Sequence, residues 1–329
     1  MAISISGTSG ISQTGSFDSA STFGFKNRII NGLMTTDQRN AAASQTFTAA
    51  AALAYSVDRW YGYCTGANVT GQQVAGSTTP SVTQFRYRFT GAASVTAVGF
   101  GQRIEQKNSY DLAGSTCTLS ADLAISATLT TVTWTASYAT TTADTFGSLA
   151  SPTITQIATG TFTVSATVTN FTTNISVPAA ATTGIQILFT VGALTAGLTW
   201  TIGNVQLEKG STATSFDYRP YGTELALCQR YYEVIGGSFG GNAYSTTYFM
   251  GASGFRVIKR ATPTLALLTT SPQLYQAGVV NKTATSASNG ASTANVDGFY
   301  MALNGFAGLV EYAGCGMNTT SVFSASSEL

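Results

Sequence analysis

The chain has 329 residues, and only 9% of them are charged, against roughly 25% in ordinary soluble domains. It is nearly neutral, with 15 Lys and Arg against 14 Asp and Glu, and it shows no basic stripe that could neutralise several phosphates. Hydrophobic residues make up 44% of the chain, so Ser, Thr, Asn, Gln and 34 glycines must cover much of the surface. This composition suits β-strands and turns rather than helices. We therefore expect an all-β protein that does not bind nucleic acid.

The chain contains no histidine, which excludes several kinds of active site. Ser-His-Asp and Cys-His catalysis, histidine-ligated zinc and a histidine base all require that side chain. The four cysteines are far apart and form no C-x-x-C pair: Cys64, Cys117, Cys228 and Cys315. We expect free thiols that pack as small hydrophobic residues, and we identify no metal ligands and no cofactor.

Hydrolysis of a glycosidic bond remains compatible with this composition, because it needs only two carboxylates about 5 to 10 Å apart. The candidate carboxylates are Asp58, Glu105, Asp111, Asp122 and Asp144. Their spacing gives no reason to pair any two of them. We interpret them as solvated or structurally paired groups and predict that the protein is not an enzyme.

In chain order, residues 1–26 come first and are rich in Ser, Gly and Thr. Such a segment cannot bury a core of its own, so it is either flexible or ordered by a partner, and we assign it as an N-terminal attachment segment. It has neither the basic region nor the apolar core of a secretory signal. The alanine-rich stretch Ala41–Tyr55 is compatible with one helical turn or with an extended connector.

From Val57 onward the pattern of alternating apolar and polar residues predicts strands. Phe85, Tyr87 and Phe89, for example, share one face of a strand whose other face carries arginines. The clearest candidates are Asp58–Cys64, Gln84–Thr90, Cys117–Ser126, Thr131–Tyr138, Thr161–Thr169 and Ile185–Val191. About eight half-buried antiparallel strands predict a jelly roll or β-sandwich over residues 27–221. The uncharged run Ile185–Ile202 fits two strands joined by a turn better than a membrane span.

The stretch Ile202–Tyr232 joins this domain to the rest of the chain. Gly203 interrupts the alternation at its start and predicts a β-bulge. Pro220 restricts the backbone, which predicts a domain boundary near Tyr221 with Gly222 as a hinge. Shorter strand candidates follow, beginning with Leu227–Ile235, and predict a smaller C-terminal β-sandwich domain over residues 222–329.

Aromatic residues are the candidate ligand contacts, because sugar rings present apolar faces that stack on Trp and Tyr. In the first domain they are Trp60, Tyr61 and Tyr63; in the loops of the second they are Tyr244, Tyr248, Tyr275, Tyr300 and Tyr312. Adjacent strand aromatics also occur where two layers pack, so a role in the core or at a domain interface is the alternative. Both interpretations stay open for the second-domain tyrosines.

A second group of residues predicts hinge and interface contacts. It comprises Arg219, Pro220, Tyr221, Arg230, Tyr231 and Tyr232. Arg59 and Arg230 fit a role in holding carboxylates or carbonyls across a chain interface better than a role in ligand binding.

Several segments resemble the phage tail-fibre and tail-appendage proteins. They are Asn27–Gly32, Asp37–Asn40, Tyr55–Tyr61, Gly101–Glu105, Val205–Gly210, Ala213–Phe216, Arg219–Glu233 and, more weakly, Ala325–Leu329. The resemblance implies a jelly-roll domain similar to carbohydrate-binding modules, within a virion protein that is commonly trimeric. Loops vary in that family, so no binding residue is carried over. The segment before Lys26 is shorter than a long fibre's shaft, which leaves a short fibre, an adaptor, or a head or neck appendage.

Together these features predict a homotrimeric virion protein, a tail fibre or appendage that recognises host-surface glycans. It would attach to other tail or virion proteins through its N-terminal segment and be assembled in the host bacterial cytoplasm, without membrane insertion. One alternative is a structural decoration, neck or baseplate protein that binds no ligand. Another is a polysaccharide depolymerase that uses two of the carboxylates named above.

Overall fold

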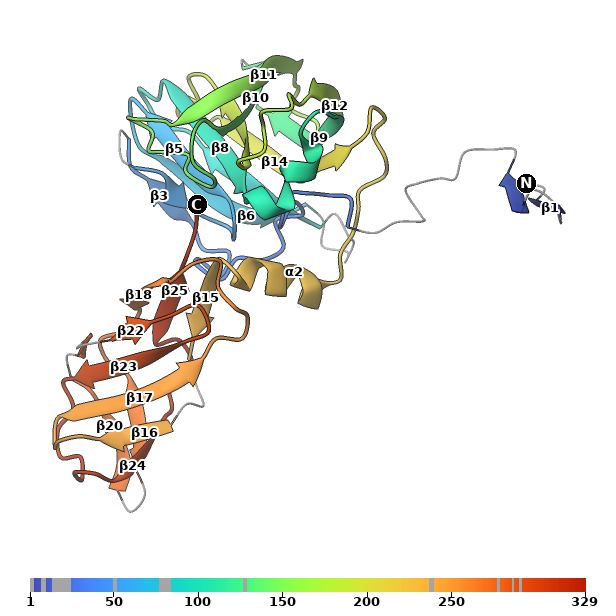
Figure 1. Cartoon of the computed structure of the whole chain (residues 1–329). Helices are drawn as coiled ribbons and strands as arrows, with labels where there is room; N and C mark the ends of the chain where they lie inside the picture. The colour runs from blue at the N-terminus through green and yellow to red at the C-terminus, as the bar shows by residue number, and fades with distance from the viewer. Residues whose placement is uncertain are drawn as a thin grey trace. The chain divides into compact units, whose positions relative to one another are not determined.

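The computed structural model describes residues 3–6, 10–13, 25–49, 52–76, 84–126, 129–236, 240–276, 279–285, 287–289 and 292–329. The chain divides into two compact units (Figure 1). Unit 1 comprises residues 1–35, 42–55 and 60–221, and unit 2 comprises residues 36–41, 56–59 and 222–329. Two short segments that the sequence places in the first domain, Thr36–Ala41 and Ser56–Arg59, thus belong to unit 2.

Unit 1 is an antiparallel β-sandwich of two six-stranded sheets. The first sheet has the order β11-β10-β13-β8-β5-β4. Its strands are β4 (Ala54–Tyr55), β5 (Tyr61–Thr65), β8 (Ala97–Ile104), β10 (Thr131–Ala139), β11 (Ile154–Thr163) and β13 (Ile185–Val191). The second has the order β12-β9-β14-β7-β6-β3. Its strands are β3 (Gln45–Phe47), β6 (Val69–Ala75), β7 (Phe85–Thr90), β9 (Thr116–Ile125), β12 (Thr169–Ser176) and β14 (Thr199–Lys209).

Aromatic side chains form the core between these sheets. The Phe89 ring of β7 lies 5.3 Å from the Phe100 ring of β8, and Trp200 of β14 stacks on Phe89 at 5.4 Å. At the other end, Phe162 of β11 contacts Phe171 of β12 at 5.3 Å. These rings contribute to the stability of unit 1, because burial of apolar area is the main favourable term in the free energy of folding. The all-β prediction with an antiparallel sandwich is confirmed.

Several local predictions for unit 1 also hold. The apolar residues of β9 are buried, as their alternation predicts. The pairing of β14 with β9 shifts register between Gly203 and Gln206, which is the predicted bulge. The predicted strand Thr161–Thr169 is wrong, because β11 ends at Thr163 and β12 begins at Thr169. Two 3-10 helices, η1 (Gln106–Asn108) and η2 (Tyr110–Leu112), follow β8.

Unit 2 contains a three-stranded sheet and a larger sheet. The small sheet has the order β15-β25-β18, with β15 (Tyr232–Ile235), β18 (Thr264–Leu267) and β25 (Phe323–Ser326). The larger sheet has the order β20-β19-β24-β16-β17-β23-β21, and β22 also pairs with β23. Its strands are β16 (Gly240–Ala243), β17 (Tyr248–Gly254), β19 (Gln273–Gln276), β20 (Val279–Thr283), β21 (Ser288–Asn289), β22 (Thr293–Ala294), β23 (Gly298–Asn304) and β24 (Gly314–Met317).

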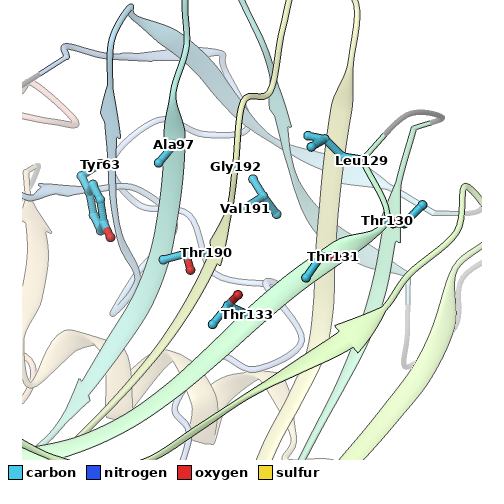
Figure 2. A pocket seen from close by; sticks show the side chains of 9 residues that line it. All are labelled: Tyr63, Ala97, Leu129, Thr130, Thr131, Thr133, Thr190, Val191 and Gly192. Atoms are coloured by element: carbon cyan, nitrogen blue, oxygen red, sulfur yellow. The ribbon is translucent and has the colours of Figure 1, made fainter.

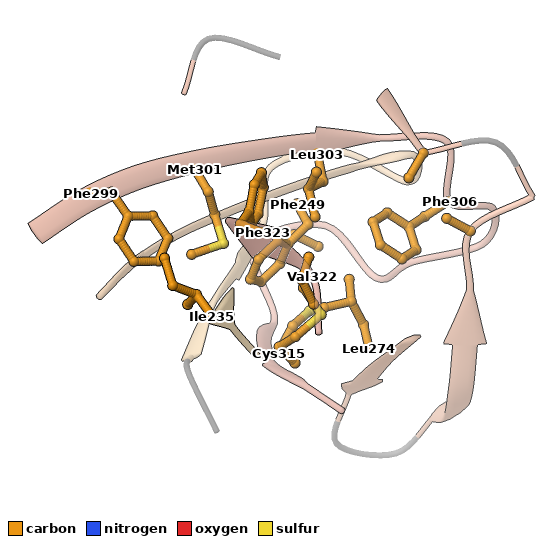
Figure 3. Close-up of a cluster of buried hydrophobic side chains, with 14 of the residues drawn as sticks. Ile235, Phe249, Leu274, Phe299, Met301, Leu303, Phe306, Cys315, Val322 and Phe323 are labelled. Atoms are coloured by element: carbon orange, nitrogen blue, oxygen red, sulfur yellow. The ribbon is translucent and has the colours of Figure 1, made fainter. Parts of the chain in front are cut away.

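The core of unit 2 joins its two sheets. Phe323 of β25 lies 6.2 Å from Phe299 of β23, and Phe249 and Leu303 are buried beside them (Figure 3). Cys315 belongs to this cluster. All four cysteines of the chain are free and buried, as predicted, and burial raises the pKa of each thiol.

The predicted strand Leu227–Ile235 is wrong at its start, because helix α2 (Tyr221–Gln229) occupies most of it. Pro220 lacks a backbone N–H and directly precedes the helix, where that donor is not needed. Glu224 lies in the first turn, where a negative charge suits the helix dipole, and the following Leu-Ala-Leu run favours helix. Gly222, the expected hinge, lies inside α2. Only β15, from Tyr232, continues as a strand.

A pair of strands near the N-terminus, β1 (Ile3–Ser6) and β2 (Gly10–Gln13), is antiparallel. Apart from these strands and residues 25 and 26, the predicted attachment segment 1–26 lies outside the described residues. Within the part of the chain that the structure describes, no helix has the length and apolar character needed to cross a bilayer.

Candidate functional site

The face of the first sheet of unit 1 that points away from the core carries the candidate site. Along this sheet, Phe100 of β8 pairs with Phe189 of β13, and these rings are buried in the core. Because side chains alternate along a strand, the neighbouring residues point to the opposite face. One row across that face consists of Tyr63, Gly99, Thr190 and Thr133, in register on β5, β8, β13 and β10.

Gly99 lets the Tyr63 ring lie against the sheet. A Cβ atom at Gly99 would be only 2.1 Å from Cε1 and 2.3 Å from Cζ of Tyr63. The ring therefore covers the backbone of β8 at a place where any other residue would push it away. This arrangement fixes the position of Tyr63 at the side of an open groove.

The Tyr63 groove has a volume of about 630 Å³ (Figure 2). Its lining residues are Tyr63, Ala97, Leu129, Thr130, Thr131, Thr133, Thr190, Val191 and Gly192. They come from β5, β8, β13, β10 and the residues just after β13 and just before β10, so a continuous sheet supports the groove. Its volume lies within the range of small-ligand sites, roughly 300–1,000 Å³.

The other part of this face is covered. Tyr61, two residues before Tyr63, lies 5.4 Å beneath the Arg103 guanidinium and contacts the Tyr55 ring at 6.2 Å. Arg103 donates hydrogen bonds to Gln186 Oε1 at 3.0 Å and to the Gly147 carbonyl at 2.9 Å. The segment between β10 and β11 thus closes this part of the sheet, and the groove occupies the part that remains open.

The chemistry of the groove is that of an uncharged surface. Four threonine hydroxyls can donate and accept hydrogen bonds, and Tyr63 adds a ring and a phenol. Burial raises the pKa of Tyr63, so its hydroxyl stays protonated at neutral pH. Of the nine lining residues, Tyr63 alone carries an ionisable group. The groove therefore offers stacking and neutral hydrogen bonds, which suits a neutral ligand rich in hydroxyls.

The three aromatic candidates of the first domain have different positions. Trp60 is fully buried, stacks on Phe100 at 4.9 Å and donates its indole N–H to the Asn31 carbonyl at 3.0 Å. Tyr61 is also buried, because Arg103 covers its ring and Tyr55 packs against it. Neither ring is accessible to a ligand in this structure, because Trp60 lies in the core and Tyr61 lies beneath Arg103 on the outer face of the sheet. Tyr63 is partly exposed and lines the groove.

The structure brings together some of the tyrosine candidates of unit 2. The Tyr244 ring lies 6.1 Å from that of Tyr248 and 6.4 Å from that of Tyr312. Tyr275, on β19, is 60% exposed. Tyr300 lines a different hollow of about 610 Å³ at the ends of β17 and β23.

Arg59, Tyr231 and Tyr232 form a cluster inside unit 2. The Arg59 guanidinium lies 3.5 Å from the Tyr231 ring centre and forms an ion pair with Glu328. Arg39 lies 3.6 Å from the Tyr232 ring centre and contacts Glu328 at 3.0 Å. Arg59 therefore holds a carboxylate of its own chain, and the burial of Tyr231 removes its ring from the surface.

The remaining hinge and interface candidates lie around α2. Arg219 is buried and donates to the Asn27 and Ile29 carbonyls, the latter at 3.1 Å, which ties the end of unit 1 to its beginning. Pro220 and Tyr221 are exposed. Arg230 is partly exposed, and its carbonyl accepts from the Arg260 N–H at 3.0 Å and the Ser327 hydroxyl at 3.1 Å.

The candidate carboxylates are not grouped in one site. Asp111 forms an ion pair with Arg28 at 2.7 Å, and Asp144 accepts the Gln106 N–H at 2.7 Å. Asp122 accepts from Asn170 at 3.0 Å, and Asp58 lies 3.4 Å from Arg39 in unit 2. Glu105 is buried. Among the described residues, no group of three or more His, Cys, Asp and Glu is placed to hold a metal ion.

Comparison with known proteins gives structural similarities without a sequence family. No protein-family model matches the chain, and no curated protein matches it. The enzymatically active domain of bacteriophage CBA120 tailspike protein 4 is 16% identical with a TM-score of 0.35, and the match covers 56% of this chain and 22% of the tailspike chain. This chain thus spans about a fifth of that tailspike chain.

Carbohydrate-binding modules are also similar to part of the chain. TmCBM61, solved with β-1,4-galactotriose, is 11% identical with a TM-score of 0.31, and the match covers 46% of this chain and 88% of the module. The C-terminal family 22 module of Clostridium thermocellum Xyn10B is 13% identical with a TM-score of 0.32, covering 48% of this chain and 90% of the module. The fold assignment of this chain rests on its own strand order and register.

Sequence reasoning missed the threonines that line the groove. Thr131 and Thr133 are polar positions of a strand that alternates as expected, and Thr190 interrupts an apolar run. In a sequence such residues indicate only a solvent-facing side. Their proximity to Tyr63 depends on which strands are neighbours, and β5, β13 and β10 are far apart in the chain.

Proposed function

We propose that this chain is a structural protein of a phage tail fibre or appendage and that it binds host-surface glycans through the Tyr63 groove. The observation that carries the binding proposal is the uncharged groove in which Gly99 positions Tyr63 beside threonine hydroxyls. The resemblance of segments such as Arg219–Glu233 to tail-fibre proteins supports the virion role.

The proposed ligand follows from the chemistry of the groove. A sugar ring has an apolar face that can stack on Tyr63 and hydroxyls that can pair with Thr133 and Thr190. Neutral hydrogen bonds contribute about 0.5–1.5 kcal/mol each, so a single shallow groove binds weakly. Three copies in a homotrimer would raise the avidity without any new contact.

Substitution of Tyr63 tests the binding site. Glycan-array binding followed by calorimetry on the purified chain should identify a glycan, and Tyr63→Ala should weaken its binding at least about tenfold, equivalent to about 1.4 kcal/mol. Tyr110→Ala, which removes an exposed ring of unit 1 outside the groove, is the matched control and should bind normally. Equal binding by the two variants would contradict the assignment of the Tyr63 groove as the glycan-binding site. Absence of binding to any glycan would favour the purely structural alternative.

We further propose that binding is not followed by hydrolysis, because the nine lining residues of the groove include no carboxylate. Incubation of the protein with host envelope polysaccharide should release no reducing ends. Release that is lost on substitution of one of the candidate carboxylates would instead establish a depolymerase.

The assembly proposal is a homotrimer that attaches to other virion proteins through residues 1–26. The low charge of the surface supports association, since neutral surfaces carry little mutual repulsion. Light scattering at micromolar concentration should give three times the chain mass of 34.0 kDa. A monomer would contradict the trimer, and immunogold labelling of particles would locate the protein on the virion.

A further inference from the structure

Unit 2 carries a compact group of tyrosine rings, Tyr244, Tyr248 and Tyr312, here called the tyrosine cluster. Tyr244 is 59% exposed and Tyr312 is 76% exposed; single exposed aromatic side chains are common, but these two are in contact with each other. The Tyr244 ring makes an angle of 76° with Tyr248 and 77° with Tyr312. Two rings thus stand nearly perpendicular to a third, so ring faces and phenol hydroxyls are presented together to solvent.

The backbone of Tyr312 is strained. Its φ of 58° lies in the left-handed region, which a bulky aromatic residue rarely adopts. Such conformations persist where the surrounding structure holds them, and they gather at functional sites. Glycine or asparagine would meet the backbone requirement at lower cost, so the conformation of the chain does not explain the presence of a tyrosine here.

Hydrogen bonds fix the backbone that carries these rings. The Tyr312 N–H donates to the Ala243 carbonyl at 2.7 Å, and the Tyr244 N–H donates to the Tyr248 carbonyl at 2.8 Å. The intervening turn is tied to the next loop, because the Leu309 N–H donates to the Thr246 carbonyl at 3.0 Å. A cluster held in this way loses little conformational entropy when it binds a ligand.

We propose that the tyrosine cluster is a second carbohydrate-binding site, which takes a single neutral sugar ring independently of the Tyr63 groove. Stacking on the exposed rings would bury the apolar face of the sugar. Its hydroxyls would pair with the phenols and with the exposed Thr246 and Thr247 of the turn. The turn between Tyr244 and Tyr248 contains no charged residue, and the exposed Glu311 beside Tyr312 disfavours an anionic ligand.

The size of the cluster favours a sugar over a second copy of the chain. A buried tyrosine removes roughly 150–250 Å² from solvent, so the exposed parts of Tyr244 and Tyr312 together offer roughly 300 Å². A stable protein interface buries about 800 Å² on each partner. The area of the cluster falls well short of this, which favours a small ligand such as a single sugar ring.

The test uses the full chain carrying Tyr63→Ala, so that the groove does not contribute. The probes are the methyl β-glycosides of glucose, galactose and N-acetylglucosamine, observed by saturation-transfer difference NMR. At least one glycoside should give a signal with Tyr63→Ala, and adding Tyr244→Ala or Tyr312→Gly should reduce that signal at least fivefold. Adding Tyr110→Ala, which removes an exposed ring that belongs to neither proposed site, should leave it unchanged.

Thermal unfolding separates binding from structure. Tyr312→Gly relieves the strained backbone, so it should keep or raise the melting temperature while reducing the signal at least fivefold. Loss of all signal with Tyr63→Ala alone would overturn the second site, while remaining consistent with glycan binding in the Tyr63 groove. A signal that survives Tyr244→Ala and Tyr312→Gly would also overturn it. A change in oligomeric state on these substitutions, with no glycoside signal, would instead identify the cluster as a contact between copies.

Discussion

The position of Tyr63 depends on the residue beneath its ring. Gly99 has room for no side chain, since a Cβ would lie 2.1 Å from the ring. Gly99→Ala should therefore displace Tyr63 from the sheet and weaken glycan binding at least about fivefold, about 1 kcal/mol. Calorimetric titration with the glycan identified for the wild-type chain would measure the change.

Gly192→Ala is the control for this prediction. Gly192 also lines the groove, but a Cβ there would meet no atom within 4 Å, so the variant adds a methyl group without touching Tyr63. It should bind within about twofold of wild type. Loss of binding in Gly192→Ala that equals the loss in Gly99→Ala would contradict the proposed role of the Tyr63 position.

Asp58 is a residue whose ionisation should affect stability. It is fully buried in unit 2, and this burial raises the pKa of its carboxyl from 3.8 to about 7, although Arg39 and the hydrogen bonds from Gln38 act in the opposite direction. Glu328 adds to the increase through charge repulsion. Between these two pKa values the folded protein holds a proton on Asp58 that the unfolded chain has lost.

The stability contributed by protonated Asp58 should be fully present below pH 4 and be lost as the pH rises to 7. The upper limit of the loss is about 4 kcal/mol, from roughly three pKa units at 1.36 kcal/mol each. Urea unfolding of wild type and Asp58→Asn at pH 4, 5.5 and 7.5 would measure it. The wild type should lose stability relative to Asp58→Asn as the pH rises, and a constant or opposite difference would contradict the assignment.

At the scale of elements, alternation in the sequence predicted most strands of unit 1. It identified β9 and β13, because one face of each is buried and the pattern has a period of two. It failed over Thr161–Thr169, where the alternation continues through a bend between two strands. It also failed at α2, because a run as short as Leu-Ala-Leu is compatible with both a helix and a strand.

The candidate site was predictable only in part. Tyr63 is identifiable as an aromatic strand residue, but its exposure depends on Gly99, which belongs to another strand. Trp60 and Tyr61 have the same sequence signal and are nevertheless buried, one by the core and the other by Arg103. Strand order and register decide these outcomes, and neither is contained in the local pattern.

Helix α2 provides a prediction about an element. Gly222 lies within the helix, and a Cβ there would meet no atom within 4 Å. Gly222→Ala should therefore stabilise the protein by about 0.5–1 kcal/mol, because glycine loses more backbone entropy in a helix than alanine. Thermal unfolding would detect the increase. A decrease in stability, or a loss of glycan binding, would favour the hinge that the sequence predicted.

At the scale of the whole molecule, unit 2 is built from three parts of the chain. Arg59, from one of the two short segments, is buried and forms an ion pair with Glu328. Glu328→Ala should leave this arginine without that carboxylate and destabilise the protein by about 3 kcal/mol. Urea unfolding followed by circular dichroism would measure the loss.

A more exposed ion pair serves as the comparison. Asp111→Ala removes the partner of Arg28, and both side chains of this pair are partly exposed. The loss should stay below about 1 kcal/mol, because solvent screens such pairs. Equal effects of Glu328→Ala and Asp111→Ala would contradict a structural role for the buried pair.

Because unit 2 is built from distant segments of the chain, it can be completed only late in synthesis on the ribosome. Arg59 precedes its carboxylate partner by 269 residues, which at about 5–20 residues per second corresponds to a delay of roughly 15 to 50 seconds. In the last part of this interval, once Tyr221 has been translated, unit 1 has all the residues of its sandwich, whereas unit 2 still lacks β25 and Glu328. A nascent chain that stops before Glu328 would leave Arg59 without that carboxylate, so its unit 2 should be cleaved by proteases faster than that of the full chain.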